Sequence, residues 1–356
     1  MASILLNTAV SPALDDAINV NDVPMRGGDD SYSSHAELQR EAALQTFPLL
    51  RRATEMAQKT SDRLTVIEYG SSHGNNTIEP LEAILPLTRA SEVMVLLSDR
   101  PQNDFNTLTN TISAWVETRN SLFLAMVPRS FYRQVVPARS VDVGFSLSSL
   151  HHLDRLPENM DLLSAQAHQD FCLFLRLRAA EFVTGGSLVI SMVGRSSSGR
   201  ENCSGPIESC RRAMRQMVEA GVLPESVAVA FRIPTYARSV NEMRSSLQEM
   251  SDDWETVELR EEDVYHPATT DFRRHRGQGE EVSRQYAHVI IEWLMAICAG
   301  YFLKAVQVGL PGPEYSDAAA ERLLNEWILR TKQLYQEHHL DEPVYFCYFH
   351  ALLRRN

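Results

Sequence analysis

Positive charge is scarce in this chain. Its 356 residues include 34 Lys and Arg against 46 Asp and Glu, which gives a formal net charge of −12 at pH 7. Nucleic acids and anionic membranes attract basic surfaces, so this balance argues against a broad contact with either. The composition is otherwise that of an ordinary globular protein, with 44% hydrophobic and 22% charged residues. A chain of this length forms one large domain or one domain with a sizeable insertion.

Cysteine and long apolar runs are scarce as well. The chain has five cysteines, an odd number without metal-ligand spacing, so we expect reduced thiols in a cytoplasmic protein. The apolar run at residues 290–299 contains Glu292 and is too short to span a membrane. The N-terminal region meets acidic residues before any basic one, unlike a signal peptide. We therefore expect no membrane partner.

A strand, a tight turn and a helix follow one another early in the chain. The apolar residues 64–67 predict a buried strand, and Glu68 comes directly after them. Gly70 and Gly74 allow the backbone to turn sharply and to approach a ligand closely. Apolar residues then recur at helical spacing, which predicts a helix that begins near Asn75.

A second strand with an acidic end follows. Residues 93–97 read as buried strand and lead to Asp99, just as residues 64–67 lead to Glu68. Because the carboxyl ends of parallel strands meet at one edge of a sheet, the two acidic residues predict a nucleoside-binding crevice there. The turn by itself does not distinguish a dinucleotide from a sulfonium cofactor.

The rest of the chain alternates strands and helices at first and then becomes mainly helical. This order predicts a doubly wound α/β core, with a mainly helical substrate cap inserted late. We place the core at residues 1–195, with its last strands near 252–260 and 343–354, and the cap at 196–342. Gly185 and Gly186 are expected to end a helix over 171–183, and the charged stretch 271–281 is expected to be mobile. Further helices are predicted over 104–115, 207–221, 282–308 and 318–336, within 234–250, and around residues 38–43. Further strands are predicted over 140–146, 188–193, 254–259 and 344–353, and residues 122–127 read as a short strand or loop.

Several motifs resemble those of one family. SDRPQNDFN at residues 98–106 is similar to the Asn-Asp-Leu-Pro-x-Asn-Asp-Phe-Asn motif of the plant-type SABATH methyltransferases. EYGSSHGNN at residues 68–76 resembles the family's Asp-x-Gly-Cys-Ser-x-Gly-x-Asn turn. Further matches lie at 25–39 (Met-x-Gly-Gly…Ser-Tyr…Gln), 127–132 (VPRSFY), 149–157 (SLHHL…P) and 231–236 (FRIPTY). The family transfers the methyl group of S-adenosylmethionine to small carboxylic acids or ring nitrogens.

This resemblance implies a Rossmann-like class I methyltransferase core, S-adenosylmethionine as the cofactor, and a homodimer. It implies that Asp99 holds the ribose hydroxyls, with Arg100 beside it, and that Ser130 and Phe131 lie next to the adenine. Glu68 stands where the family carries Asp, which marks a divergent member. The cofactor-binding residues that the resemblance implies are Tyr32, Glu68, Gly70, Asn76, Asp99, Arg100, Ser130 and Phe131.

The resemblance also implies a place for the methyl acceptor. Gln39 and His152 match residues that hold the substrate carboxylate, and His151 lies close to the same carboxylate, so these three are the implied catalytic residues. Ser148 replaces a pocket tyrosine, Ile207 falls near a second pocket tryptophan, and His152 itself replaces a tryptophan. All five are implied substrate-binding residues. Because the aromatic pocket residues are replaced, we expect the general reaction to be retained and the plant substrates not to be.

The expected reaction is the formation of a methyl ester on a small organic acid. A carboxylate, with a pKa of about 4, is already ionised at neutral pH, so the reaction needs orientation and no general base. If the acceptor were a phenol or a ring N–H, His151 or His152 would be the natural base, and the protein would be an N- or phenol-O-methyltransferase instead.

Two further classes of protein compete with a methyltransferase. A dehydrogenase is disfavoured because Gly70 and Gly74 lack the G-x-G-x-x-G spacing. A non-catalytic protein that binds a small molecule and has kept the cofactor fold stays open. No metal site is predicted, because the pair His151 and His152 lacks a third ligand at suitable spacing.

Overall fold

The computed structural model describes residues 36–57, 62–310 and 315–356. These residues form an eight-stranded mixed sheet in the order β3-β2-β1-β4-β5-β8-β7, with the short β6 paired to β5. Strands β1 to β5 run parallel along this order, and β8 and β7 extend the sheet with antiparallel pairing. The strands are β1 Arg63–Tyr69, β2 Glu92–Asp99, β3 Leu122–Pro128, β4 Val141–Leu147, β5 Phe182–Arg195, β6 Arg238–Ser239, β7 Trp254–Tyr265 and β8 Tyr345–Arg355.

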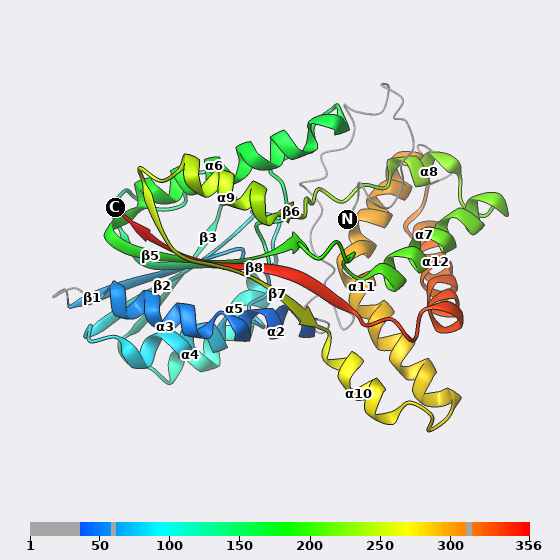
Figure 1. The fold of residues 1–356 in the computed structure, drawn as a ribbon, viewed down its shortest axis with the longest axis horizontal. Helices are drawn as coiled ribbons and strands as arrows, with labels where there is room; N and C mark the ends of the chain where they lie inside the picture. The colour runs from blue at the N-terminus through cyan, green and yellow to red at the C-terminus, as the bar shows by residue number, and fades with distance from the viewer. Residues whose placement is uncertain (1–35, 58–61, 311–314) are drawn as a thin grey trace.

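Helices cover both faces of this sheet (Figure 1). One face carries α6 (Leu163–Glu181) and α9 (Val240–Glu249), and the other carries α3 (Phe47–Met56), α4 (Ile78–Ile84) and α5 (Phe105–Glu117). Helix α2 (Glu37–Gln45) precedes α3. A buried apolar cluster lies under each set of helices. This arrangement confirms the predicted doubly wound α/β core.

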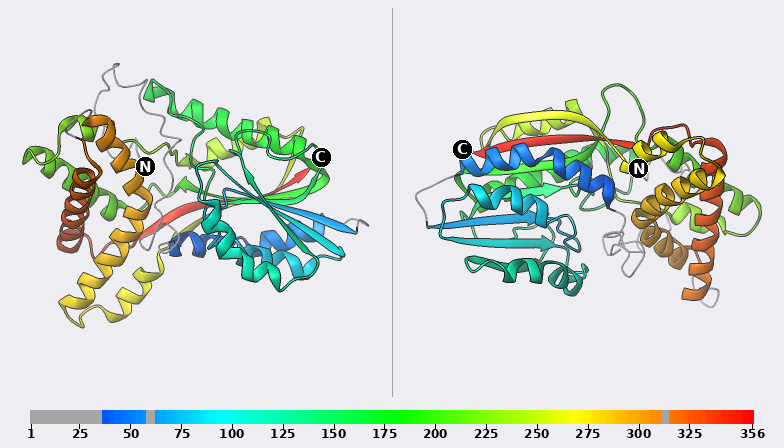
Figure 2. Two further views of the ribbon diagram at one scale, coloured as in Figure 1. Left: turned by 180° about the vertical axis from the view of Figure 1, so that it is seen from behind. Right: turned by 90° about the horizontal axis from the view of Figure 1, so that it is seen from below.

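A second group of helices lies beyond one end of the sheet, as Figures 1 and 2 show. It consists of α7 (Ser204–Glu219), α8 (Glu225–Ala230), α11 (Glu280–Gly309) and α12 (Asp317–His338), which share an apolar cluster of their own, with α10 (Pro267–His275) at its edge. Helix α9 follows this group's first members in sequence, yet it packs against α6 and β7 on the sheet.

Helix α11 is the central element of this group. Among the helices of the described residues, it alone is long and apolar enough to cross a membrane. However, 67% of its most apolar window is buried inside the protein. Burial of that kind is what a core helix of a globular fold shows.

Three local predictions were wrong. Helix α6 ends at Glu181 and passes directly into β5, so Gly185 and Gly186 lie within that strand and cap no helix. The pairing of β4 with β5 jumps from Val141↔Phe182 to Val143↔Ser187. The glycines fall inside this bulge, where Gly185 has a φ of 81° and a Cβ at Gly186 would lie 3.0 Å from the carbonyl oxygen of Asp142.

The other two wrong predictions concern the charged stretch 271–281 and the start of α4. The first half of the charged stretch 271–281 belongs to α10, because Phe272 is buried and stacks on Tyr286 with ring centroids 4.2 Å apart. Helix α4 begins at Ile78 instead of near Asn75. The residues between them form a turn, in which the Thr77 hydroxyl donates to Glu68.

Candidate active site

The site forms where the sheet order reverses. Strand β1 has β2 on one side and β4 on the other, so the loops that follow these strands diverge and leave a crevice at their carboxyl ends. Gly70 makes the first turn of the crevice with a φ of 89°. A Cβ atom there would lie 2.3 Å from Ser149 Oγ, so only glycine lets the loops after β1 and β4 approach so closely.

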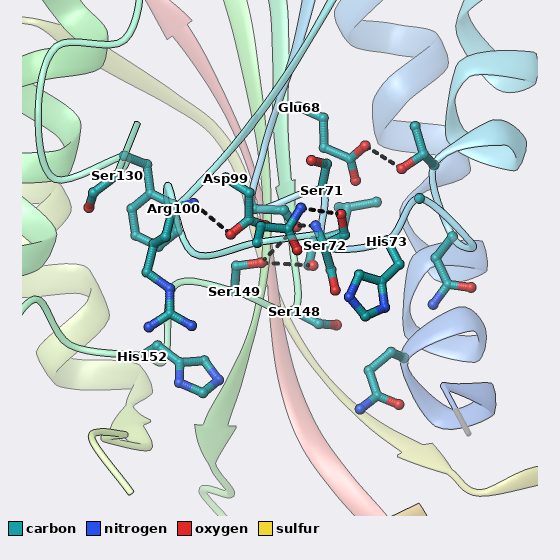
Figure 3. Close-up of a pocket in the computed structure, with 18 of the residues that line it drawn as sticks. Glu68, Ser71, Ser72, His73, Asp99, Arg100, Ser130, Ser148, Ser149 and His152 are labelled. Carbon is teal, nitrogen blue, oxygen red and sulfur yellow. Dashed lines mark hydrogen bonds between the residues drawn. The ribbon is translucent and has the colours of Figure 1, made fainter. Parts of the chain in front are cut away.

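Asp99 ends β2 with both carboxylate oxygens held by the backbone. Oδ2 accepts the N–H of Ser72 at 2.6 Å, and Oδ1 accepts the N–H of Arg100 at 2.7 Å. Burial raises the pKa of Asp99, and these two N–H donors oppose that rise. The carboxylate is therefore oriented before any ligand arrives, next to the turn that carries Ser71 and Ser72 (Figure 3).

Glu68 lies next to the last residue of β1 and lines the same crevice. Its Oε2 accepts the hydroxyl of Thr77 at 2.7 Å, and the residue is only 5% exposed. Burial raises the pKa of Glu68 to about 8, although the bond from Thr77 opposes the rise. A cation bound in the crevice would favour the ionised form of this carboxyl group.

These residues line a cavity of about 310 Å³. Tyr32 lies outside the described residues, so its place stays a prediction. Every other residue that the sequence proposed for the cofactor lines this cavity, namely Glu68, Gly70, Asn76, Asp99, Arg100, Ser130 and Phe131.

Several residues of this lining were not predicted. Ser71, Ser72 and His73 from the turn after β1, together with Asn103, line it too. In the described part of the chain, the hydroxyls of Ser71 and Ser72 are buried and lack a hydrogen-bond partner. Residues 71–74 belong to a motif that the sequence shows, but only the folded turn shows that the hydroxyls of Ser71 and Ser72 remain available to a ligand.

A second cavity, of about 610 Å³, adjoins the first. Gln39, Ser148 and His152 line both cavities, and His151 and Ile207 line only the second. The five residues proposed for the acceptor therefore come together, although they lie on α2, on α7 and in the loop after β4. Their individual roles stay predictions.

The second cavity also has a lining that the sequence did not reveal. Thr235 is buried, and within the described ranges its Oγ1 lacks a hydrogen-bond partner, as does Nδ1 of His151. Phe346 and Tyr348 of β8 and Ile297 of α11 line the same space. Residues so far apart in sequence gave no local signal of a shared pocket.

The two histidines are uncharged. Burial lowers the pKa of His152 to about 3, helped by the positive charge of Arg100. Burial, helped by the neighbouring His152, also holds the pKa of His151 well below its usual range. Their ring centroids lie 4.6 Å apart. Each ring therefore offers one N–H donor and one acceptor nitrogen at neutral pH.

The whole fold has a solved counterpart. The structure is similar to that of a loganic acid methyltransferase with S-adenosylhomocysteine, with a TM-score of 0.76 and 20% identity over 94% of this chain and 99% of the other. That similarity establishes the fold. The fold, with its crevice at the carboxyl ends of β1 and β2, is of the Rossmann-like class.

The family follows from the sequence profile of the SAM-dependent carboxyl methyltransferases, which matches residues 20–164 and 160–297. The chain belongs to this family, and its cofactor is S-adenosylmethionine. It is 46% identical to the methyltransferase FUS9 of Gibberella moniliformis, over 96% of this chain and 99% of the relative. It is 39% identical to the O-methyltransferase acrG of Aspergillus aculeatus, over 96% and 98%. A salicylate/benzoate carboxyl methyltransferase of Arabidopsis thaliana is 29% identical, over 63% of this chain and 70% of the relative.

The first cavity suits this cofactor. S-adenosylmethionine carries a sulfonium and an ammonium group, and the lining holds the buried carboxyl group of Glu68 and the half-buried one of Asp99. Its ribose hydroxyls and carboxylate need polar partners, and the buried hydroxyls of Ser71 and Ser72 are available as such. The residues present therefore fit the cofactor that the family requires.

Proposed function

We propose that the protein transfers the methyl group of S-adenosylmethionine to the carboxylate of a small organic acid and forms a methyl ester. The observation that carries the proposal is the junction of the two cavities at Gln39, Ser148 and His152. Hydrogen-bond donors are present there, and the histidines are too weakly basic for proton abstraction. The Arabidopsis relative, whose name states carboxyl methylation, supports the same reaction.

The main task of the protein in this reaction is to align the acceptor oxygen with the methyl group of the cofactor. When bound, the cofactor supplies an electrophilic methyl group, and the methyl–sulfur bond breaks as a carboxylate oxygen forms the new bond. Gln39 and His152 donate hydrogen bonds that orient the acceptor oxygen toward the first cavity. No proton is transferred, so no side chain must act as a base.

The lowered histidine pKa values favour a carboxylate over a phenol. A base with a pKa of about 3 is mismatched by roughly seven units to a phenol, whose pKa is about 10. His152 would therefore be an inefficient base for phenol or ring N–H acceptors. A carboxylate arrives ionised and needs none.

The size of the second cavity limits the acceptor only loosely. A volume of about 610 Å³ lies in the range that accommodates a drug-sized ligand. Acids larger than a single aromatic ring therefore belong in any substrate panel.

We further propose a cytoplasmic homodimer, on the resemblance to the family alone. Sedimentation at a mass near 40.2 kDa, that of one chain, would contradict the dimer.

Transfer of a labelled methyl group across a panel of acids, phenols and amines tests the reaction. We expect label only in acids, in products that release methanol under mild alkali as esters do. With saturating S-adenosylmethionine, which favours the ionised form of Glu68, we also expect turnover to be nearly independent of pH between about 6 and 8, since both histidines stay neutral there. Label in alkali-stable ethers or in amines would overturn the carboxylate proposal. Cofactor binding without any acceptor would favour a non-catalytic binding protein.

A further inference from the structure

Gln39 can present either of two opposite groups to the junction of the cavities. Its side-chain amide ends in a carbonyl oxygen, which accepts hydrogen bonds, and in an N–H₂ group, which donates them. The residue lies on α2, is 8% exposed and lines both cavities. Whatever holds one end of the amide decides which end the acceptor meets.

Trp293 holds the oxygen end. Its Nε1–H donates to Oε1 of Gln39 at 3.2 Å. Because an indole N–H only donates, it pairs with the carbonyl oxygen and rejects the N–H₂ group. The opposite amide orientation would place two donors face to face in a buried site.

Trp293 is itself fixed in place. It lies on α11, is fully buried and belongs to the lining of neither cavity. Its ring packs against His266 and Phe346, with centroids 5.3 and 5.5 Å away. The indole therefore has little room to rotate, and its N–H direction is set by the packing of the helical group.

We propose that Trp293 is a positioning residue that makes Gln39 select carboxylate acceptors, an inference that rests on the proposed function. By holding the carbonyl oxygen, Trp293 leaves the N–H₂ group of Gln39 to meet the acceptor. A carboxylate accepts that hydrogen bond, whereas an amine or a ring N–H would need an acceptor at this point. The helical group beyond the sheet thereby determines the polarity of a side chain on α2.

The substitution Trp293→Phe tests this, because it keeps an aromatic ring and removes the N–H donor together with part of the indole volume. We expect kcat/KM for the best acid to fall about 10- to 100-fold, since the Gln39 amide is then free to flip. We expect the Kd for S-adenosylmethionine to stay within about twofold. The ratio of acid to amine methylation should fall as well.

A matched control separates positioning from general stability. Trp327 is another fully buried tryptophan, and its Nε1–H donates to the carbonyl oxygen of Cys210 at 3.0 Å, within the helical group. Trp327→Phe should cost similar thermal stability and leave kcat/KM within about twofold of the wild type. A similar loss of kcat/KM in both variants would assign the effect to stability and overturn the proposal.

A double-mutant cycle gives the decisive comparison. If Trp293 acts through Gln39, then Trp293→Phe should change kcat/KM by less than about twofold in a Gln39→Ala background. A full additional loss in that background would overturn the proposal.

A crystal structure of the wild type with S-adenosylhomocysteine and an acid keeps the two proposals distinguishable. If Trp293 Nε1 does not contact Gln39 Oε1, the positioning proposal fails, whether or not acids are methylated. This test uses the wild type, so it does not depend on the folding of Trp293→Phe. If the contact is present but amines or phenols prove to be the acceptors, the proposed function fails and so does carboxylate selection. Retention of the contact, with the acid carboxylate on Gln39 Nε2, supports both.

Discussion

Asp99 shows how one residue at the end of a strand becomes a specific contact. Its two carboxylate oxygens are held by the N–H groups of Ser72 and Arg100, so they are aimed before the cofactor arrives. A ligand that donates hydroxyl groups to this carboxylate loses little free energy in orienting it. The resemblance assigned the ribose contact to Asp99, and the structure adds the reason why the carboxylate is ready for it.

Substitution of Asp99 tests this contact. Asp99→Ala should weaken S-adenosylmethionine binding by about 1.5–3 kcal/mol, since a charge-assisted hydrogen bond is lost. Calorimetry measures the change in Kd.

Asp104, which lies in the same motif, provides a control. It caps α5 by accepting from the N–H groups of Asn106 and Thr107. Asp104→Ala should lower stability by about 1 kcal/mol and leave the Kd alone; equal losses of affinity in both variants would refute a direct role for Asp99.

His350 carries a prediction about stability and pH. It is fully buried in β8, and burial, helped by the charge of Arg260, lowers its pKa to about 3. In the unfolded chain the pKa of a histidine is about 6.5. Between these two values the unfolded chain holds a proton that the folded protein does not, so stability decreases as the pH falls below about 6.5.

His350→Phe removes that proton-binding group. The stability of the wild type relative to this variant should fall by about 1 kcal/mol when the pH is lowered from about 7.5 to about 5.5. Urea denaturation at the two pH values measures the difference. A stability difference that is the same at both would show that His350 is not held neutral.

At the scale of elements, the turn after β1 is the most constrained part of the crevice. Gly70 and Gly185 both have strongly positive φ angles, of 89° and 81°. They differ in their surroundings, because a Cβ at Gly70 would collide with Ser149, whereas one at Gly185 would meet nothing within 4 Å. A side chain at either position would therefore strain the backbone. Only at Gly70 would it also collide with a neighbouring residue at the cavity.

This pair gives a controlled experiment. Gly185→Ala should lower stability by about 1–2 kcal/mol through strain and leave cofactor affinity unchanged. Gly70→Ala should cost at least that much stability and also weaken S-adenosylmethionine binding by about tenfold or more, because Ser149 must move. Denaturation and calorimetry report the two quantities separately. Normal cofactor affinity in Gly70→Ala would show that the close approach of the two loops is dispensable.

At the scale of the whole molecule, β8 joins the sheet to the helical group. Its side chains alternate between the two: Phe346 and Tyr348 belong to the apolar cluster of the helices, and Cys347 and Phe349 belong to a cluster under the sheet. The two parts therefore share one continuous strand. They should not unfold independently.

Calorimetry tests this coupling. We expect a single thermal transition that S-adenosylhomocysteine shifts upward as a whole, by roughly 4 °C at a ligand concentration of about 100 times Kd. Asp99→Ala should show a much smaller shift at the same ligand concentration. Two transitions, of which the ligand moves only one, would mean that the sheet and the helical group are separate folding units.

The sequence by itself determined the features that depend on neighbouring residues. Strands β1 and β2, whose carboxyl ends carry Glu68 and Asp99, and the turn between β1 and α4 were predicted, because strand and turn preferences act over a few residues. The motif at residues 98–106 is read directly from the sequence. The resemblance of these motifs also indicated the family and its cofactor. Gly185 and Gly186 show the limit of such reasoning, since the same two letters can end a helix or form a bulge.

Only the tertiary structure decided which distant residues meet and how buried they are. Gln39, His152 and Trp293 come from three separate parts of the chain, and their contacts arise only when α2 and α11 pack beside the loop after β4. The shifted pKa values of Glu68 and His152 arise chiefly from burial, which no local pattern records. The physical reason is that local preferences act within a segment, whereas the polarity and protonation of a site depend on packing between segments.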